Sequence, residues 1–220
     1  MKHKITPILI DGRKEWIYHN VKVLEHTLEI LESIKSIEAK NPIYFSPEHF
    51  NHPEIQCILS DNINSVPAYS NFCIKLGEFL KDDSYILVCQ YDGYPLYKEN
   101  WTDEFLEYDY IGSPWGTDRP DHKRVGNGGF SLRSARLIKL VSELVPNPNG
   151  FSEDLVICDV LGDILQQNYN IKFAPISLAM KFSFEHYIPE RNDMQLNECF
   201  GFHDFKCGPI EEKNKHRIKI

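Results

Sequence analysis

The amino-acid sequence predicts an α/β fold in which helices flank a mixed, mostly parallel sheet, followed by an irregular C-terminal region. Short apolar runs bounded by Pro, Gly or Asn alternate with segments of helical periodicity, and this alternation is typical of parallel sheets. The 220 residues suffice for one domain with a core around a ligand crevice, and the 42% hydrophobic and 12% aromatic content is that of a globular protein.

The alternation is clearest in the first half of the chain. The strand candidates there are residues 6–10, 42–45, 55–59 and 84–89. The helix candidates are residues 17–31 and a segment whose apolar face comprises Phe72, Leu76, Phe79 and Leu80. Ligands of parallel sheets gather at the carboxyl ends of the strands, so we expect chemistry just after Cys89.

The second half is less regular. Its strand candidates are residues 129–132 and 171–174, and its helix candidates are residues 135–144 and 155–166. No periodic pattern follows residue 174, so we expect an irregular C-terminal stretch.

Charge and apolar patterning exclude several classes of function. A net charge of -8 and a pI near 5.6 oppose nucleic-acid binding, which demands clustered Lys and Arg. The apolar stretch at residues 5–10 is too short for a signal peptide, and no run approaches a membrane span. We therefore expect a cytoplasmic protein, or one of the host cytoplasm if the source is a virus.

The first candidate site follows the strand at residues 84–89. Gln90-Tyr91-Asp92-Gly93 places a carboxylate and a glycine at the end of an apolar strand. Oxygen ligands on a loop suit Mn²⁺ or Mg²⁺ held jointly with a phosphate group, so Asp92 is a candidate for binding a metal or a diphosphate. A turn without a ligand is the alternative.

A glycine-rich segment provides the second candidate. Residues 125–133 read V-G-N-G-G-F-S-L-R, and Gly128 and Gly129 allow the backbone to approach a sugar or phosphate closely. Arg133 is a candidate for contacting a diphosphate. A hairpin turn at Asn127-Gly128 is the alternative.

Two acidic residues and one histidine complete the candidates. Glu153 and Asp154 precede a helical run, where a carboxylate either deprotonates an acceptor hydroxyl or only complements the helix dipole. His203 is either a metal or phosphate ligand or a packed structural residue.

Together these motifs resemble a family of uncharacterised glycosyltransferase-like proteins of bacteria, fungi and large viruses, catalogued as a domain of unknown function. The resemblance spans about residues 72–204. It is carried by residues 89–92, 105–115, 125–133, 153–154, 182–185 and 201–203.

The resemblance implies a GT-A-like, Rossmann-like fold for nucleotide-diphospho-sugars. A single glycosyltransferase-like domain would span residues 1–220, with a nucleotide-sugar half at about residues 1–95 and an acceptor and catalytic half at about residues 96–210.

The same resemblance assigns roles to the candidate residues. Asp92 stands where such enzymes carry an Asp-x-Asp metal motif, with Gln90 in place of the first acid. His203 is similar to their late metal-binding histidine. Gly128-Gly129 and Glu153-Asp154 resemble the acceptor side and the catalytic base of inverting enzymes.

The leading hypothesis is therefore transfer of a sugar from a nucleotide-diphosphate donor, with a UDP-sugar favoured, to a glycan, protein or small molecule. Asp154 or Glu153 would act as base, Asp92 and His203 would hold Mn²⁺ or Mg²⁺, and Arg133 would support the phosphates. A non-catalytic nucleotide-sugar or glycan-binding module is the alternative, because Gln90 leaves the acidic motif incomplete. A glycoside hydrolase is a third reading, which the parallel-sheet start does not favour.

Overall fold

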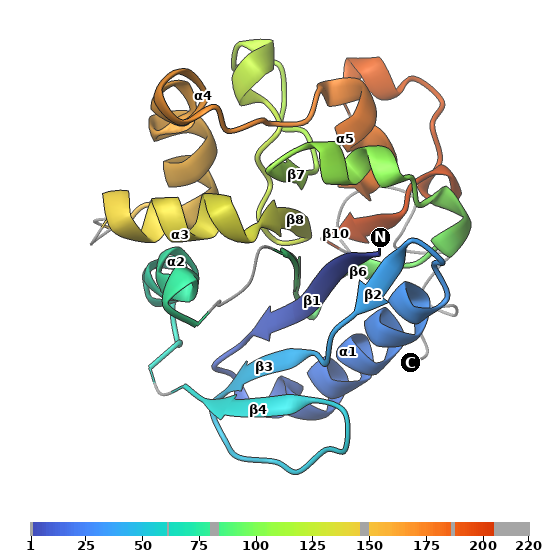
Figure 1. Ribbon diagram of the computed structural model, residues 1–220, viewed down its shortest axis with the longest axis vertical. Coiled ribbons are helices and arrows are strands. Elements are labelled where there is room, and N and C mark those ends of the chain that lie inside the picture. Colours follow the sequence, from blue (N-terminus) through green and yellow to red (C-terminus); the bar gives the residue numbers. More distant parts are fainter. Residues whose placement is uncertain (1, 61, 80–83, 146–149, 186–187, 205–220) are drawn as a thin grey trace.

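The computed structural model describes residues 2–60, 62–79, 84–145, 150–185 and 188–204. Its main sheet has seven strands, ordered β4-β3-β1-β5-β8-β7, with β2 also paired to β1 (Figure 1). The strands are β1 (His3–Ile10), β2 (Ile37–Ala39), β3 (Ile43–Ser46), β4 (Gln56–Leu59), β5 (Tyr85–Cys89), β7 (Tyr110–Gly112) and β8 (Ser131–Ser134). Pairings among the first five are parallel, whereas β8 runs antiparallel to β5 and β7. The predicted mixed, mostly parallel sheet is confirmed.

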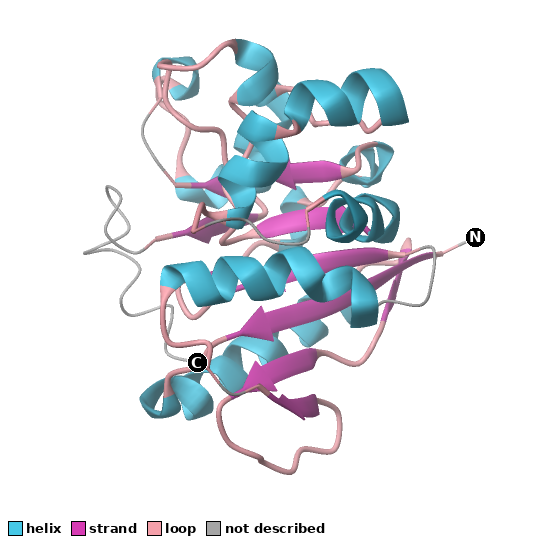
Figure 2. Ribbon diagram, turned by 90° about the vertical axis from the view of Figure 1, so that its left-hand side faces the viewer, coloured by secondary structure: helices cyan, strands magenta, loops and turns pink. Residues whose placement is uncertain are grey.

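Helices cover both faces of this sheet, and Figure 2 shows them packed against the stacked strands. The longer helices are α1 (Ile17–Glu32), α2 (Val66–Ile74), α3 (Ala135–Leu144), α4 (Gly162–Tyr169) and α5 (Ile176–Phe182). Because side chains alternate along a strand, Ile5 and Leu9 of β1 pack in one core with α1. Ile8 and Ile10 pack in a second core with α2 and α3.

Serine residues fix the starts of two helices. The Ser65 hydroxyl accepts a hydrogen bond from Ala68 N at 3.4 Å at the start of α2, and the Ser134 hydroxyl accepts one from Leu137 N at 3.1 Å at the start of α3. Each bond satisfies a backbone donor that the first helical turn leaves without a partner. Ser134 is the last residue of β8 and α3 begins at Ala135, so the chain passes from strand to helix without a loop.

Several predicted boundaries differ from the structure. The helix predicted at residues 155–166 is a π-helical segment, Leu155–Val160, followed by α4, and the strand predicted at residues 129–132 lies at Ser131–Ser134. The helix predicted around residues 72–80 is α2 followed by a 3-10 turn, Lys75–Phe79, and Leu80 lies outside the described residues. The strand predicted at residues 171–174 is wrong, because only an isolated bridge from Phe173 to Tyr110 forms there.

The region predicted to be irregular contributes two strands, β9 and β10, to a second, three-stranded sheet. It comprises β6 (Gly93–Pro95), β10 (Gly201–His203) and β9 (Ser183–Phe184), in that order. β10 runs antiparallel to β6, and its register pairs His203 with Gly93. This pairing carries the end of the described chain to the end of β5.

Short 3-10 turns connect these elements. They are Lys14–Trp16, Lys98–Asn100, Asp103–Glu107, Asp121–Lys123, Pro189–Arg191 and Leu196–Glu198. Among the described helices, none is long and apolar enough to cross a membrane.

Replacing Phe182 by Ala tests the core beneath the small sheet. Phe182 is fully buried, stacks on Phe130 with ring centroids 4.9 Å apart and meets Phe105 edge-on at 5.2 Å. Loss of the ring leaves a cavity, so we expect Phe182→Ala to lower the free energy of unfolding by about 3–5 kcal/mol in a denaturant titration. The 58% exposed Phe151 provides the control, and Phe151→Ala should change it by less than about 0.5 kcal/mol. Equal effects of the two substitutions would contradict the assigned core.

Candidate functional site

A cavity of about 400 Å³ opens at the carboxyl ends of β1 and β5, where the parallel sheet predicts a ligand site. Small-molecule sites typically have volumes of about 300–1,000 Å³. Five residues predicted from the sequence line it: Gln90, Gly129, Glu153, Asp154 and His203. Asp92, Gly128 and Arg133 contact these lining residues.

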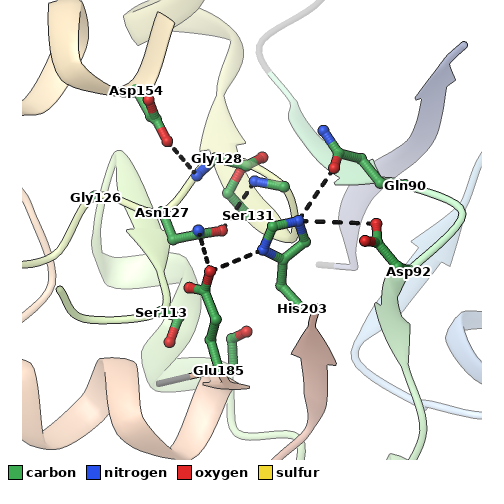
Figure 3. A network of polar contacts seen from close by, with 12 residues as sticks. Gln90, Asp92, Ser113, Gly126, Asn127, Gly128, Ser131, Asp154, Glu185 and His203 are labelled. Atoms are coloured by element: carbon green, nitrogen blue, oxygen red, sulfur yellow. Dashed lines mark hydrogen bonds and ion pairs between the residues drawn. The ribbon is translucent and has the colours of Figure 1, made fainter. Parts of the chain in front are cut away.

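Three side chains converge at the end of β5 (Figure 3). His203 Nε2 lies 3.1 Å from Gln90 Oε1 and 3.9 Å from Asp92 Oδ1. Asp92 is buried, and its Oδ1 atom has no hydrogen-bond partner in the described part of the chain. Burial raises the pKa of Asp92, and the charge of His203 opposes that rise.

The other nitrogen of His203 faces a buried carboxylate. His203 Nδ1 lies 3.1 Å from Glu185 Oε1, which also accepts a hydrogen bond from Asn127 Nδ2 at 2.8 Å. Burial lowers the pKa of His203, but the hydrogen bond to Glu185 and the charges of Glu185 and Asp92 outweigh it and raise the pKa. The site thus joins β5, the glycine-rich segment, β9 and β10.

The glycines of the site make room for side chains of the protein itself. A Cβ atom on Gly129 would lie 2.0 Å from His203 Nε2, and one on Gly128 would lie 2.4 Å from Glu153 Oε1. A Cβ atom on Gly93 would lie 2.8 Å from His203 Cδ2. The hairpin alternative at Asn127-Gly128 is wrong, because its turn needs positive φ angles and Gly150 alone among the described glycines has one.

The two adjacent acids have different environments. Glu153 Oε1 accepts a hydrogen bond from Arg133 Nη2 at 2.9 Å, and both side chains are buried. Asp154 accepts hydrogen bonds from the backbone nitrogens of Gly128 at 3.2 Å and Leu155 at 2.8 Å. Burial and the charge of Glu153 raise the pKa of Asp154 to about 6. Both acids lie at the start of a helix, as predicted.

Arg133 does not fit the direct phosphate contact predicted from the sequence. Its side chain is fully buried, and its guanidinium donates to Glu153 Oε1, to the Gly128 carbonyl at 3.1 Å and to the Ser131 hydroxyl at 3.0 Å. A group without exposed surface cannot contact a ligand in the cavity. Its position instead compensates the charge of Glu153.

The convergent side chains suit a divalent cation. Asp92 offers a carboxylate oxygen that accepts no hydrogen bond from the described residues, Gln90 an amide oxygen and His203 an imidazole nitrogen. All three are ligands of Mn²⁺ in proteins. No cluster of three or more His, Cys, Asp or Glu side chains suited to a metal occurs in the described ranges. A cation here would therefore complete its coordination with phosphate or water oxygens.

Sequence reasoning missed several lining residues. Asp11 and Arg13 follow β1, and Arg13 Nη2 lies 2.8 Å from Asp11 Oδ2 with the guanidinium 4.3 Å from the ring centre of Tyr91. In the sequence, Asp11-Gly12 indicates only that the strand candidate at residues 6–10 ends there. Glu185 does not line the cavity; it belongs to the 182–185 motif of the family resemblance, which assigned no role to it.

The fold is GT-A-like, as the sequence predicts. The chain is similar to a glycosyltransferase involved in the glycosylation of the major capsid of PBCV-1, with 13% identity over 98% of this chain and 99% of that chain and a TM-score of 0.56. Galactosyltransferase LgtC in complex with donor and acceptor sugar analogues matches 98% of this chain and 93% of its own at 12% identity, with a TM-score of 0.47.

The chain belongs to the family described as "Protein of unknown function (DUF5672)", whose model matches residues 52–203. No curated protein sequence matches it significantly. The family resemblance predicted from the motifs is confirmed.

Substituting Gly129 tests whether the His203 imidazole needs a residue without a side chain at position 129. Gly129→Ala places a methyl group within 2.0 Å of His203 Nε2, so His203 must leave its position. We expect the His203 imidazole resonances of the folded protein to shift in NMR spectra. Gly116→Ala is the control, because a Cβ atom there would meet only Asp118 Oδ1, at 3.5 Å, and it should leave these resonances unchanged. Gly150 is unsuitable as a control because its φ angle is positive. Unshifted resonances in Gly129→Ala would contradict the described packing.

Proposed function

We propose that the protein is a glycosyltransferase that moves a sugar, with inversion, from a nucleotide-diphosphate donor to an acceptor hydroxyl. A UDP-sugar is the favoured donor, and the acceptor is a glycan, protein or small molecule. The observation that carries the proposal is the convergence of Asp92 Oδ1, His203 Nε2 and Gln90 Oε1 beside the cavity of a GT-A-like fold.

Asp92 and His203, with Gln90, would hold Mn²⁺ or Mg²⁺ together with the donor. When bound, the cation neutralises charge on the departing nucleoside diphosphate. Asp92 Oδ1 supports this role, because it accepts no hydrogen bond within the described residues and lies only 3.9 Å from His203 Nε2. A buried carboxylate oxygen without a donor is costly unless a ligand satisfies it.

Asp154 is the better candidate for the catalytic base. Glu153 is committed to Arg133, so its oxygen is held away from proton transfer, whereas Asp154 lines the cavity without a cationic partner within salt-bridge distance in the described chain. A pKa of about 6 leaves Asp154 ionised at neutral pH and still basic enough to accept a proton. Asp154 would take the proton of the acceptor hydroxyl while the acceptor oxygen bonds to the anomeric carbon of the sugar and the bond from that carbon to the diphosphate breaks, which releases the nucleoside diphosphate.

The proposal divides the chain into two halves. Residues 1–95 supply the donor side through the ends of β1 and β5, and residues 96–210 supply the acceptor side through Asn127, Gly129 and Asp154. Residues 205–210 of the second half lie outside the described part.

A non-catalytic nucleotide-sugar or glycan-binding module is the second candidate, and one observation favours it. Gln90 replaces a carboxylate with a neutral amide, which removes one negative charge from the cation site. Such a module would bind the donor and leave the sugar in place.

Titration calorimetry with UDP, GDP, CDP and their sugars, with and without Mn²⁺, tests the donor site. We expect Mn²⁺-dependent binding of one nucleotide family. Asp92→Asn should weaken that binding about tenfold or more, because it removes the charged ligand. Asp193→Asn changes an exposed carboxylate and should bind as the unchanged protein does. If no nucleotide binds under any condition, the donor-site model is wrong.

Asp154→Asn tests the base. The amide keeps the size of the side chain and one accepting oxygen, so it retains one of the two backbone hydrogen bonds, but it cannot take a proton. We therefore expect turnover of a donor that binds in calorimetry to fall about 100-fold or more with donor affinity unchanged. Since protonated Asp154 cannot act, kcat/KM of the unchanged enzyme should fall about tenfold per pH unit below about pH 6. Asp193→Asn should retain both the rate and the pH profile.

Retained turnover in Asp154→Asn would remove this residue from the mechanism. Tight donor binding without turnover in the unchanged protein, over a broad set of acceptors, would instead favour the binding module.

A further inference from the structure

The buried network around His203 has a feature that the proposed function does not use. Glu185 and Asn127 are buried and lie on the Nδ1 side of the His203 ring, whereas Asp92 lies on the Nε2 side (Figure 3). A carboxylate 4% exposed needs compensating hydrogen bonds, and Glu185 Oε1 accepts one from Asn127 Nδ2 at 2.8 Å. Asn127 is itself held, because its Oδ1 atom accepts a hydrogen bond from Gly129 N at 3.0 Å.

We propose that Glu185 is a positioning residue: it fixes neutral His203 with its hydrogen on Nδ1, and so presents the Nε2 lone pair to a divalent cation beside Asp92. This inference rests on the metal site of the proposed function. Glu185 does not contact the cation in this arrangement and acts only through His203.

Distances favour this tautomer. Both imidazole nitrogens face a carboxylate, but Glu185 Oε1 lies 3.1 Å from Nδ1, within hydrogen-bond range, whereas Asp92 Oδ1 lies 3.9 Å from Nε2, beyond it. Nε2 also faces Gln90 Oε1 at 3.1 Å, but a hydrogen bond to a carboxylate is stronger than one to a neutral amide, so a single ring hydrogen forms the stronger bond on Nδ1. Histidine ligands of metals commonly donate their other N–H to a carboxylate, which fixes the ring and strengthens the ligand.

The remaining neighbour of Nε2 accommodates the same tautomer. The side-chain amide of Gln90 lies 3.1 Å from Nε2 and 2.9 Å from the Tyr69 hydroxyl. In the structure the amide oxygen faces Nε2 and the amide nitrogen faces Tyr69, which is the orientation that the cation site uses. While no cation is bound, rotation of the amide places its nitrogen toward His203, where it donates to the Nε2 lone pair. Because the Tyr69 hydroxyl donates as well as accepts, this orientation of Gln90 loses no hydrogen bond.

The ¹⁵N chemical shifts of the His203 ring test the tautomer without a metal. They are measured by long-range ¹H–¹⁵N correlation on the full chain at alkaline pH, where the neutral imidazole is populated, with His203→Gln to assign the signals. We expect the hydrogen on Nδ1. A hydrogen on Nε2, or hydrogens on both nitrogens throughout the alkaline range, would overturn the positioning role, since the cluster would then be a structural ion pair.

Binding of Mn²⁺ alone, followed by electron paramagnetic resonance, tests the consequence for the metal. Glu185→Gln keeps the volume of the side chain but removes its charge, so we expect Mn²⁺ affinity to fall about 10–100-fold and the Nδ1 preference to weaken. Glu143→Gln alters an exposed carboxylate of α3 and should change neither readout.

The possible failures are distinct. If the unchanged protein binds Mn²⁺ and Glu185→Gln binds it equally tightly, the positioning role is overturned and the proposed function stands. If the unchanged protein has the Nδ1 hydrogen but binds no Mn²⁺, the metal role in the proposed function is overturned, while the tautomer assignment is supported.

Discussion

The antiparallel pairing of β10 with β6 is the contact on which the candidate site depends. It pairs residues more than a hundred positions apart, such as His203 and Gly93. It thereby brings the His203 ring to Gln90, which lies 113 residues earlier in the chain. The main sheet brings the ends of β1 and β5 together by itself, but only this pairing adds an imidazole to them. Gly93 and Gly129 allow the ring to lie against both backbones.

Compensation of buried charge organises the rest of the site. Arg133 pairs with Glu153, Glu185 accepts hydrogen bonds from Asn127 and faces His203, and Asp11 pairs with Arg13. Isolated buried charges are costly, so these pairs restrict where each acid can lie. Asp154 and Asp92 are exceptions: burial is the largest cause of the raised pKa of each. Carboxylates kept with incomplete compensation, as Asp154 is in the cavity and Asp92 beside it, are typical of functional sites.

The sequence was sufficient to predict five of the seven strands of the main sheet, the helices other than α5, and the residues that converge. Periodicity located α1 and α3 because both bury one face against a strand layer. Pattern reasoning failed where contacts over long distances decide the structure. The short strands β9 and β10 carry no alternating pattern, and they form only because β6 and the aromatic cluster around Phe182 lie beside them. Arg133 was assigned to the ligand because its charge is visible in the sequence, whereas its burial is not.

The order in which the chain is made gives the β6–β10 pairing a further meaning. Domains generally fold as units, and β10 is the last described strand to be translated. Almost all of the described chain must therefore be made before His203 can meet Asp92 and Gln90. Until then, a nascent chain could not hold a ligand through His203.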